Sequence, residues 1–168
     1  MNTLIFNIQG WTFDIDVDAT KSYSDALCLD HCECGYCKNY YEAVKGSYPS
    51  LVAFLNGLGI GHEGPVDFLP VEPTLCIVSY AVCGKVIRAG NNYIELDNVS
   101  ISVHDAAELD YTLSCKEPYF VVTTNALVLP WLLEEDKDEV ISPANEPECL
   151  DRMWTTLLRD ADFFGFQS

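Results

Sequence analysis

Four cysteines fall within ten residues of this chain, and their spacing is the clearest chemical signal in the sequence. Cys28, Cys32, Cys34 and Cys37 follow the pattern C-x3-C-x-C-x2-C. Zinc binds cysteine thiolates in a tetrahedron, and a C-x2-C pair is a frequent part of such sites. Gly35, inside the pair, is the small residue that a tight turn accepts. The cluster therefore predicts a structural zinc site, with these four cysteines as candidate metal ligands.

The spacing alone leaves the complete ligand set open. A zinc ribbon carries a second C-x2-C pair about 15 to 20 residues from the first, and this chain has no second pair. Ligands must then come from the neighbourhood of the cluster or from distant segments that fold against it. The residues that could supply them are Cys28, Cys32 and His31 nearby, and Cys76, Cys83, His62 and His104 elsewhere in the chain.

A second hypothesis for the cluster is thiol-redox chemistry at Cys34 and Cys37. The sequence C-G-Y-C resembles the active-site dithiol of thioredoxin-like oxidoreductases, and a helix is expected after it. A helix N-terminus lowers the pKa of a thiol. The family motif follows a buried strand, however, and residues 24–27 do not have a strand pattern. Asp30 and Glu33 also place negative charge beside the thiols, which disfavours thiolates.

The third interpretation is that these cysteines are reduced thiols that only pack. Free cysteine behaves as a small hydrophobic residue and is often buried. This interpretation applies most directly to four other cysteines, which lie on predicted strand or helix faces and are expected in the core. They are Cys76, Cys83, Cys115 and Cys149.

The residues that follow the cluster extend the pattern. Residues 32–40 read C-E-C-G-Y-C-K-N-Y, and a segment L-P-W-L-L occurs later, at residues 129–133. The combination C-x-C-x-x-C-[K/R]-N-[F/Y] with a later L-P-W segment resembles a group of uncharacterised bacterial proteins. The resemblance implies a bacterial, cytosolic protein, and it implies no activity.

The charge of the chain is strongly unbalanced. Among 168 residues, 26 acidic side chains face 9 basic ones, which gives a net charge of −17. Nucleic-acid backbones and anionic membranes would repel such a protein. A basic protein or a cationic ligand is the electrostatically favoured partner. The leading functional hypothesis from the sequence is an acidic, non-enzymatic protein that binds a basic partner; the zinc site and the redox enzyme are the alternatives.

The N-terminus predicts a cytoplasmic protein. Residues 1–9 carry no positively charged segment, and their apolar run is broken by Asn7 and Gln9. No segment approaches the roughly 20 apolar residues that span a membrane. The eight cysteines are then expected to be reduced, as thiols are in the cytosol.

The elements predict one α+β domain over residues 1–168. An N-terminal hairpin turns at Gln9–Gly10, and a central meander of strands completes an antiparallel sheet, with about three helices packed mainly on one face. The predicted helices cover residues 38–45, about 49–58 and 148–159. The predicted strands of the meander cover residues 75–81 (extended or paired by 85–88), 94–96, 99–103 and 119–128.

Three aspartates near the hairpin admit two interpretations. Asp14, Asp16 and Asp18 alternate at the spacing of a calcium-binding loop. Such a loop needs glycine at its sixth position, which is Ala19 here. The alternation of Phe13, Ile15 and Val17 favours instead a half-buried strand with the aspartates on its solvated face.

Overall fold

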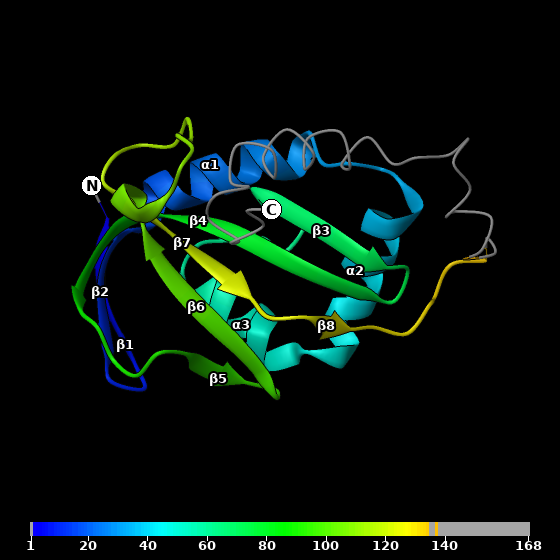
Figure 1. Ribbon diagram of the computed structural model, residues 1–168. Coiled ribbons are helices and arrows are strands. Elements are labelled where there is room, and N and C mark those ends of the chain that lie inside the picture. Colours follow the sequence, from blue (N-terminus) through cyan, green and yellow to red (C-terminus); the bar gives the residue numbers. More distant parts are fainter. Residues whose placement is uncertain (1, 135–136, 138–168) are drawn as a thin grey trace, which may run out of the picture.

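The computed structural model describes residues 2–134 and 137, and within them the chain forms an α+β fold (Figure 1). Three helices follow the N-terminal hairpin, and the remaining strands follow the helices. The helices are α1 (Val17–Leu29), α2 (Gly35–Ser47) and α3 (Pro49–Gly57), with a short 3-10 turn η1 (Ala106–Glu108). The strands are β1 (Thr3–Ile8), β2 (Trp11–Asp16), β3 (Asp67–Glu72), β4 (Leu75–Arg88), β5 (Ile94–Leu96), β6 (Val99–Asp105), β7 (Tyr119–Thr124) and β8 (Leu127–Val128).

The N-terminal hairpin is confirmed, and its second strand ends earlier than expected. β1 and β2 pair antiparallel around Gln9 and Gly10, whose φ angles are 47° and 86°. The strand stops at Asp16, because the Asp16 carboxylate accepts a hydrogen bond from Ala19 N (3.0 Å) and so caps helix α1. N-cap aspartates satisfy an otherwise unpaired amide of the first helical turn. Val17 and Asp18, expected in the strand, are therefore helical.

Strand β4 is the centre of the sheet. It has 14 residues, and it pairs antiparallel with four other strands along its length. The order β1-β2-β4-β7-β6-β5 runs across the sheet, with β3 and β8 also paired to β4. The predicted antiparallel sheet is confirmed, including the extension of β4 through Arg88. Strand β3 was not predicted, because its six residues, D-F-L-P-V-E, do not alternate between apolar and polar and include Pro70.

The β5–β6 hairpin turns where the sequence predicts it. Asp97 and Asn98 have φ angles of 51° and 64°, the left-handed conformation that Asn and Asp tolerate best. The turn also reaches the helical layer. The Asp97 carboxylate accepts hydrogen bonds from Ser50 N (2.7 Å) and Leu51 N (3.2 Å), so a residue of the sheet caps helix α3.

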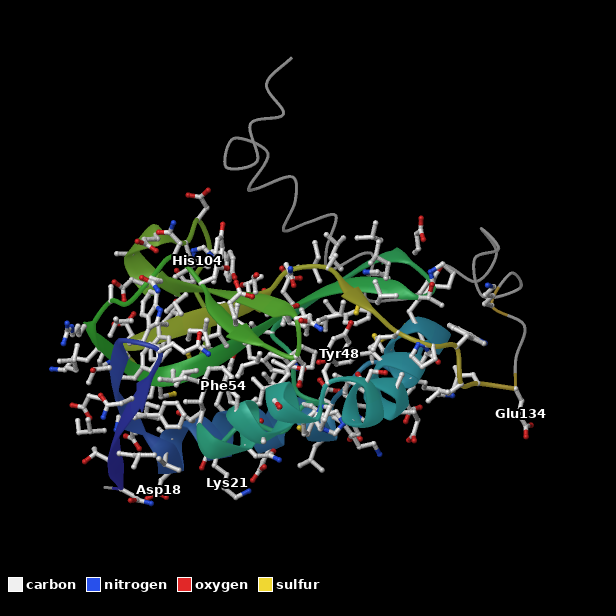
Figure 2. The ribbon with its side chains drawn as sticks, turned by 90° about the horizontal axis from the view of Figure 1, so that it is seen from below. Asp18, Lys21, Tyr48, Phe54, His104 and Glu134 are labelled. Atoms are coloured by element: carbon white, nitrogen blue, oxygen red, sulfur yellow. The ribbon has the colours of Figure 1, made fainter. Side chains whose placement is uncertain are left out.

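The helices lie on one face of the sheet, as predicted, and the core fills the space between the two layers. Figure 2 shows Lys21 on the helical layer and His104 on the sheet layer. Tyr40 and Val44 of α2 and Leu55 of α3 are fully buried there. The spacing of the buried α2 residues is that of one helical face, which is how a helix covers a sheet. The buried hydrogen bond between Tyr40 and Tyr80 joins α2 to β4.

The helix boundaries differ from the prediction in two ways. Helix α1 was missed. Helix α2 starts at Gly35 and passes through Gly46, so it is longer than the predicted segment 38–45. Helix α3 begins with Pro49 at its first turn, as predicted, and is followed by Gly59 at a φ of 91°. The predicted helix 148–159, with Cys149, lies outside the described residues.

Candidate metal centre

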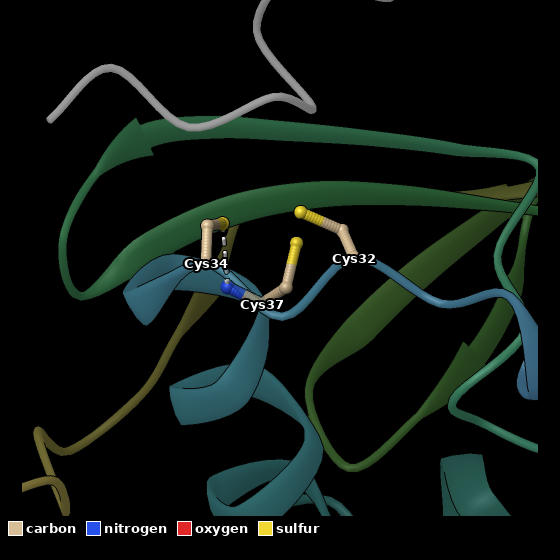
Figure 3. A group of neighbouring side chains, drawn as sticks. All are labelled: Cys32, Cys34 and Cys37. Carbon is tan, nitrogen blue, oxygen red and sulfur yellow. Dashed lines mark hydrogen bonds between the residues drawn. The ribbon is translucent and has the colours of Figure 1, made fainter.

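Three of the four clustered cysteines converge in space. The sulfur atoms of Cys32, Cys34 and Cys37 all lie within 4.8 Å of one another (Figure 3). The loop after α1 carries Cys32, and Cys34 is the N-cap residue of α2. Cys37 lies three residues further on, in the first turn of the helix, so its side chain shares a face with the cap. The start of α2 thus brings together the sulfur atoms of three cysteines that are two and three positions apart in the sequence.

The backbone around the three thiols is held by hydrogen bonds. Cys34 Sγ accepts a hydrogen bond from Cys37 N at 3.5 Å, the dashed line of Figure 3. Tyr41 donates its hydroxyl proton to the carbonyl oxygen of Cys32 at 3.0 Å. The first contact gives a thiolate an amide donor at the positive end of a helix. The second fixes the loop that carries Cys32 against the second turn of α2.

The site lies at the border between core and solvent. Cys37 is 2% exposed, and Cys32 and Cys34 are partly exposed and packed against the main core. Burial raises the pKa of the Tyr41 hydroxyl well above its usual range, and the neighbouring thiols of Cys37 and Cys32 add to that rise. Tyr41 is therefore a neutral hydrogen-bond donor at any physiological pH.

Cys28, the fourth predicted ligand, is not part of this sulfur group. It lies in the last turn of α1, with its Sγ 3.9 Å from the carbonyl oxygen of Gly61. A Cβ placed on Gly64 would lie 3.0 Å from the same sulfur, so the 61–64 turn packs closely on it. Burial raises the pKa of the Cys28 thiol. The Cys28 side chain therefore packs on the 61–64 turn and not with the other three thiols.

A small pocket opens beside the sulfur group. It has a volume of about 80 Å³, enough for a few water molecules. Two of the thiols, Cys32 and Cys37, line it together with His31, Tyr41 and Glu63. Asp30 and Asp67 are also on its wall, so it is acidic. Tyr41 could have been anticipated from its position four residues after Cys37, but Glu63 has no local signal in the sequence.

The arrangement suits a thiolate-binding metal ion. Tetrahedral zinc with bonds of about 2.3 Å to sulfur holds its ligand sulfurs roughly 3.8 Å apart. The three sulfurs, all within 4.8 Å, are close enough to hold a metal ion after small side-chain rotations. No other group of three or more candidate ligands occurs within residues 2–134 and 137. Two of the same thiols, Cys34 and Cys37, are also the pair that the redox hypothesis requires.

The remaining described cysteines are core residues, as predicted. Cys76 is 3% exposed in the main core. Cys83 and Cys115 pack with Ala81 and Tyr119 in a second, smaller apolar cluster. Burial raises the pKa of the Cys76 and Cys115 thiols to about 12. These thiols are therefore protonated at neutral pH.

Asn39 connects the two parts of the C-x-C-x-x-C-K-N-Y and L-P-W pattern. Its side chain is buried, and its amide nitrogen donates to Pro130 O at 3.0 Å. Its amide oxygen accepts from Leu132 N at 2.7 Å. One side chain of α2 thus holds the backbone of the 129–133 segment on both sides of Trp131.

Comparisons of the chain with protein-family models, with curated proteins and with solved structures found no match. Among the described residues, no helix combines the length and the apolar character needed to cross a membrane. The geometry of the cysteine site and the charge of the chain are the two features that bear on its function.

Proposed function

We propose that this protein binds one zinc ion through Cys32, Cys34 and Cys37 and that the ion has a structural role. The observation that carries the proposal is the mutual approach of three sulfur atoms to within 4.8 Å. A dithiol enzyme needs two such thiols, whereas a metal centre uses a third. Thiolate ligands favour zinc over hard cations such as magnesium and calcium.

The structural role is supported by where the three ligands lie in the chain. The loop between α1 and α2 carries Cys32 and is attached to α2 through the Tyr41 hydroxyl bond and the stacking of His31 on Tyr41. A metal bound to Cys32, Cys34 and Cys37 would join this loop to the helix N-terminus. Since metal ligands are not preorganised in the unfolded chain, the binding free energy adds to the free energy of folding.

The test is elemental analysis of natively purified protein together with four single variants. Wild-type protein and Cys28→Ser are expected to carry about one zinc per chain, because Cys28 lies outside the sulfur group. Cys32→Ser, Cys34→Ser and Cys37→Ser are expected to lose most of it. Metal-free wild-type protein with a Cys34–Cys37 disulfide would contradict the proposal and favour the redox alternative.

A second candidate function is binding of a basic protein, and the observation that favours it is charge. The net charge is −17, and within the described part of the chain lysines pair with carboxylates at Lys21–Asp25, Lys45–Glu42 and Lys116–Asp16. Most carboxylates thus have no lysine or arginine available to neutralise them. Electrostatic association weakens as ionic strength rises. Binding to a lysine-rich peptide that weakens steeply with added sodium chloride would support this function, and salt-independent binding or none would contradict it.

A further inference from the structure

His31 is the residue next to the sulfur group that has an unmet bonding capacity. Its Nδ1 atom is buried and has no hydrogen-bond partner, although part of the ring remains exposed. The ring stacks on Tyr41, with centroids 4.6 Å apart and an angle of 24° between the planes. Tyr41 is the residue that also holds Cys32 in place. A buried polar atom without a partner is unfavourable unless a ligand or ion satisfies it.

The imidazole and two of the three thiols line the same small pocket. His31, Cys32 and Cys37 all line it, and the carboxylate of Glu63 lies on the same wall. Glu63 Oε2 is 3.6 Å from His31 Nδ1, just beyond hydrogen-bonding distance. Residues 31–33 form no helix or strand. A small rotation of the His31 side chain within this loop can therefore change two distances together: the distance from the ring to the Glu63 carboxylate and the distance from the ring to the sulfur atoms.

Three thiolates leave one corner of a zinc tetrahedron open. Within the described residues, no fourth cysteine, histidine or carboxylate joins the sulfur group. Three thiolates and Zn²⁺ already sum to a charge of −1, in a pocket with three carboxylates on its wall, those of Asp30, Glu63 and Asp67. A neutral ligand is electrostatically preferred in such surroundings, because another anion would add repulsion in a poorly solvated space. Among the side chains that commonly bind zinc in proteins, the imidazole of histidine is the one that binds as a neutral group.

We propose that His31 is the fourth zinc ligand, binding through Nε2, and that Glu63 accepts a hydrogen bond from Nδ1. This inference rests on the proposed function, since it concerns the same ion. Histidines that bind zinc usually donate their second ring N–H to a carboxylate, which fixes the tautomer and the ring orientation. The Glu63 carboxylate, whose Oε2 is 3.6 Å from Nδ1, needs only a small movement to accept that hydrogen bond. Four protein ligands make a closed site, so the ion would stabilise the fold and would have no position for substrate.

Cobalt(II) titration of the reduced protein tests the ligand set, because the visible spectrum of cobalt(II) reports ligand identity. The wild type is expected to give a tetrahedral spectrum with thiolate charge-transfer bands. His31→Ala is expected to shift the visible bands and to weaken binding roughly 10- to 100-fold, and Glu63→Gln to weaken it less. The control, His104→Ala, removes a histidine of β6 that contacts Ser102 and Glu108, and should match the wild type.

The outcomes separate this inference from the proposed function. Added imidazole is expected to restore the wild-type spectrum of His31→Ala. An unchanged spectrum and affinity in His31→Ala would overturn the His31 assignment while leaving the three-thiolate site in place. Failure of the wild type to bind cobalt(II) or zinc would overturn both proposals.

A measurement on the wild type avoids any effect of the substitutions on folding. X-ray absorption of the zinc-loaded protein is expected to show three sulfur neighbours at about 2.3 Å and one nitrogen at about 2.0 Å, with the outer-shell scattering of an imidazole ring. Four sulfur neighbours, or three sulfurs without imidazole scattering, would contradict the assignment.

Discussion

The cysteines of this chain occupy two kinds of surroundings. Cys32, Cys34 and Cys37 lie at the start of α2, where a backbone amide donates to one sulfur and two of the side chains reach solvent. Cys83 and Cys115 lie in an apolar cluster, where burial raises the pKa of both thiols. Both regions bring cysteines together, but in the second region burial outweighs the local hydrogen bonds and raises the pKa of both thiols, whereas two side chains of the first region reach solvent. Proximity alone therefore does not make a metal site.

The largest expected difference between the two regions is the effect of metal removal on stability. Zinc at 1,000 times its Kd stabilises a folded protein by about 4 kcal/mol, which for a domain of this size is roughly 10 °C in Tm. A chelator should lower the Tm of the wild type and of Cys83→Ser by similar amounts and leave that of Cys37→Ser unchanged. Thermal unfolding of the three proteins with and without chelator makes the comparison. Equal chelator effects in all three would contradict it.

Substitution in the apolar cluster should affect folding and not metal. Cys83 is 1% exposed, so Cys83→Ser places a hydroxyl in an apolar site and is expected to lower the free energy of unfolding by roughly 1–3 kcal/mol. Urea unfolding of the zinc-loaded protein measures the loss, and the zinc content should stay at the wild-type value. Loss of zinc in Cys83→Ser would show that the two regions are not independent.

The stability of the folded protein is expected to fall at alkaline pH because of its buried core thiols. The Cys76 pKa rises from 9.0 to about 12 in the folded protein because the thiol is buried. Above pH 9 the unfolded chain loses this proton and the folded chain keeps it, so the unfolded state binds fewer protons and stability falls as pH rises toward 12. Urea unfolding across this range should show a shallower decline in Cys76→Ala than in the wild type. Parallel declines would indicate that other groups cause the alkaline loss.

The smallest predicted effect concerns the support of the metal site. Tyr41→Phe removes the hydroxyl that donates to Cys32 O and leaves the ring that stacks on His31. One hydrogen bond contributes about 1 kcal/mol, so zinc affinity should fall by about five-fold. Competition with a zinc-binding dye measures the change. The control, Tyr48→Phe, removes a hydroxyl that bonds the backbone of Val128 and should leave zinc affinity unchanged.

Much of the fold could be predicted from the sequence because the patterns that determine it lie within short segments. The hairpin at Gln9–Gly10, the Asp97–Asn98 turn and the apolar run of β4 each carry their own pattern. Helix α1 was missed because its cap, Asp16, is one of three alternating aspartates that also fit a strand. Strand β3 was missed because it is held by pairing with β4 rather than by its own alternation.

The candidate site was predicted only in part, for the same physical reason. The C-x2-C spacing identifies Cys34 and Cys37, and Cys32 follows from being two residues away. Cys28 was grouped with them by sequence distance, but it occupies the end of a helix that the sequence did not reveal. Glu63 reaches the pocket from a turn 32 residues after His31, so no local pattern could indicate it.

Alkylation of the native protein with mass-spectrometric mapping tests most directly whether Cys32, Cys34 and Cys37 act as one ligand set. Cys32 and Cys34 are partly exposed, so in metal-free, reduced protein they should react faster than Cys76, Cys83 and Cys115. One equivalent of zinc is predicted to protect Cys32, Cys34 and Cys37 together and to leave the rates of the other cysteines unchanged. If zinc leaves the rates of these three cysteines unchanged, or protects a different set, the three cysteines do not bind zinc as one ligand set.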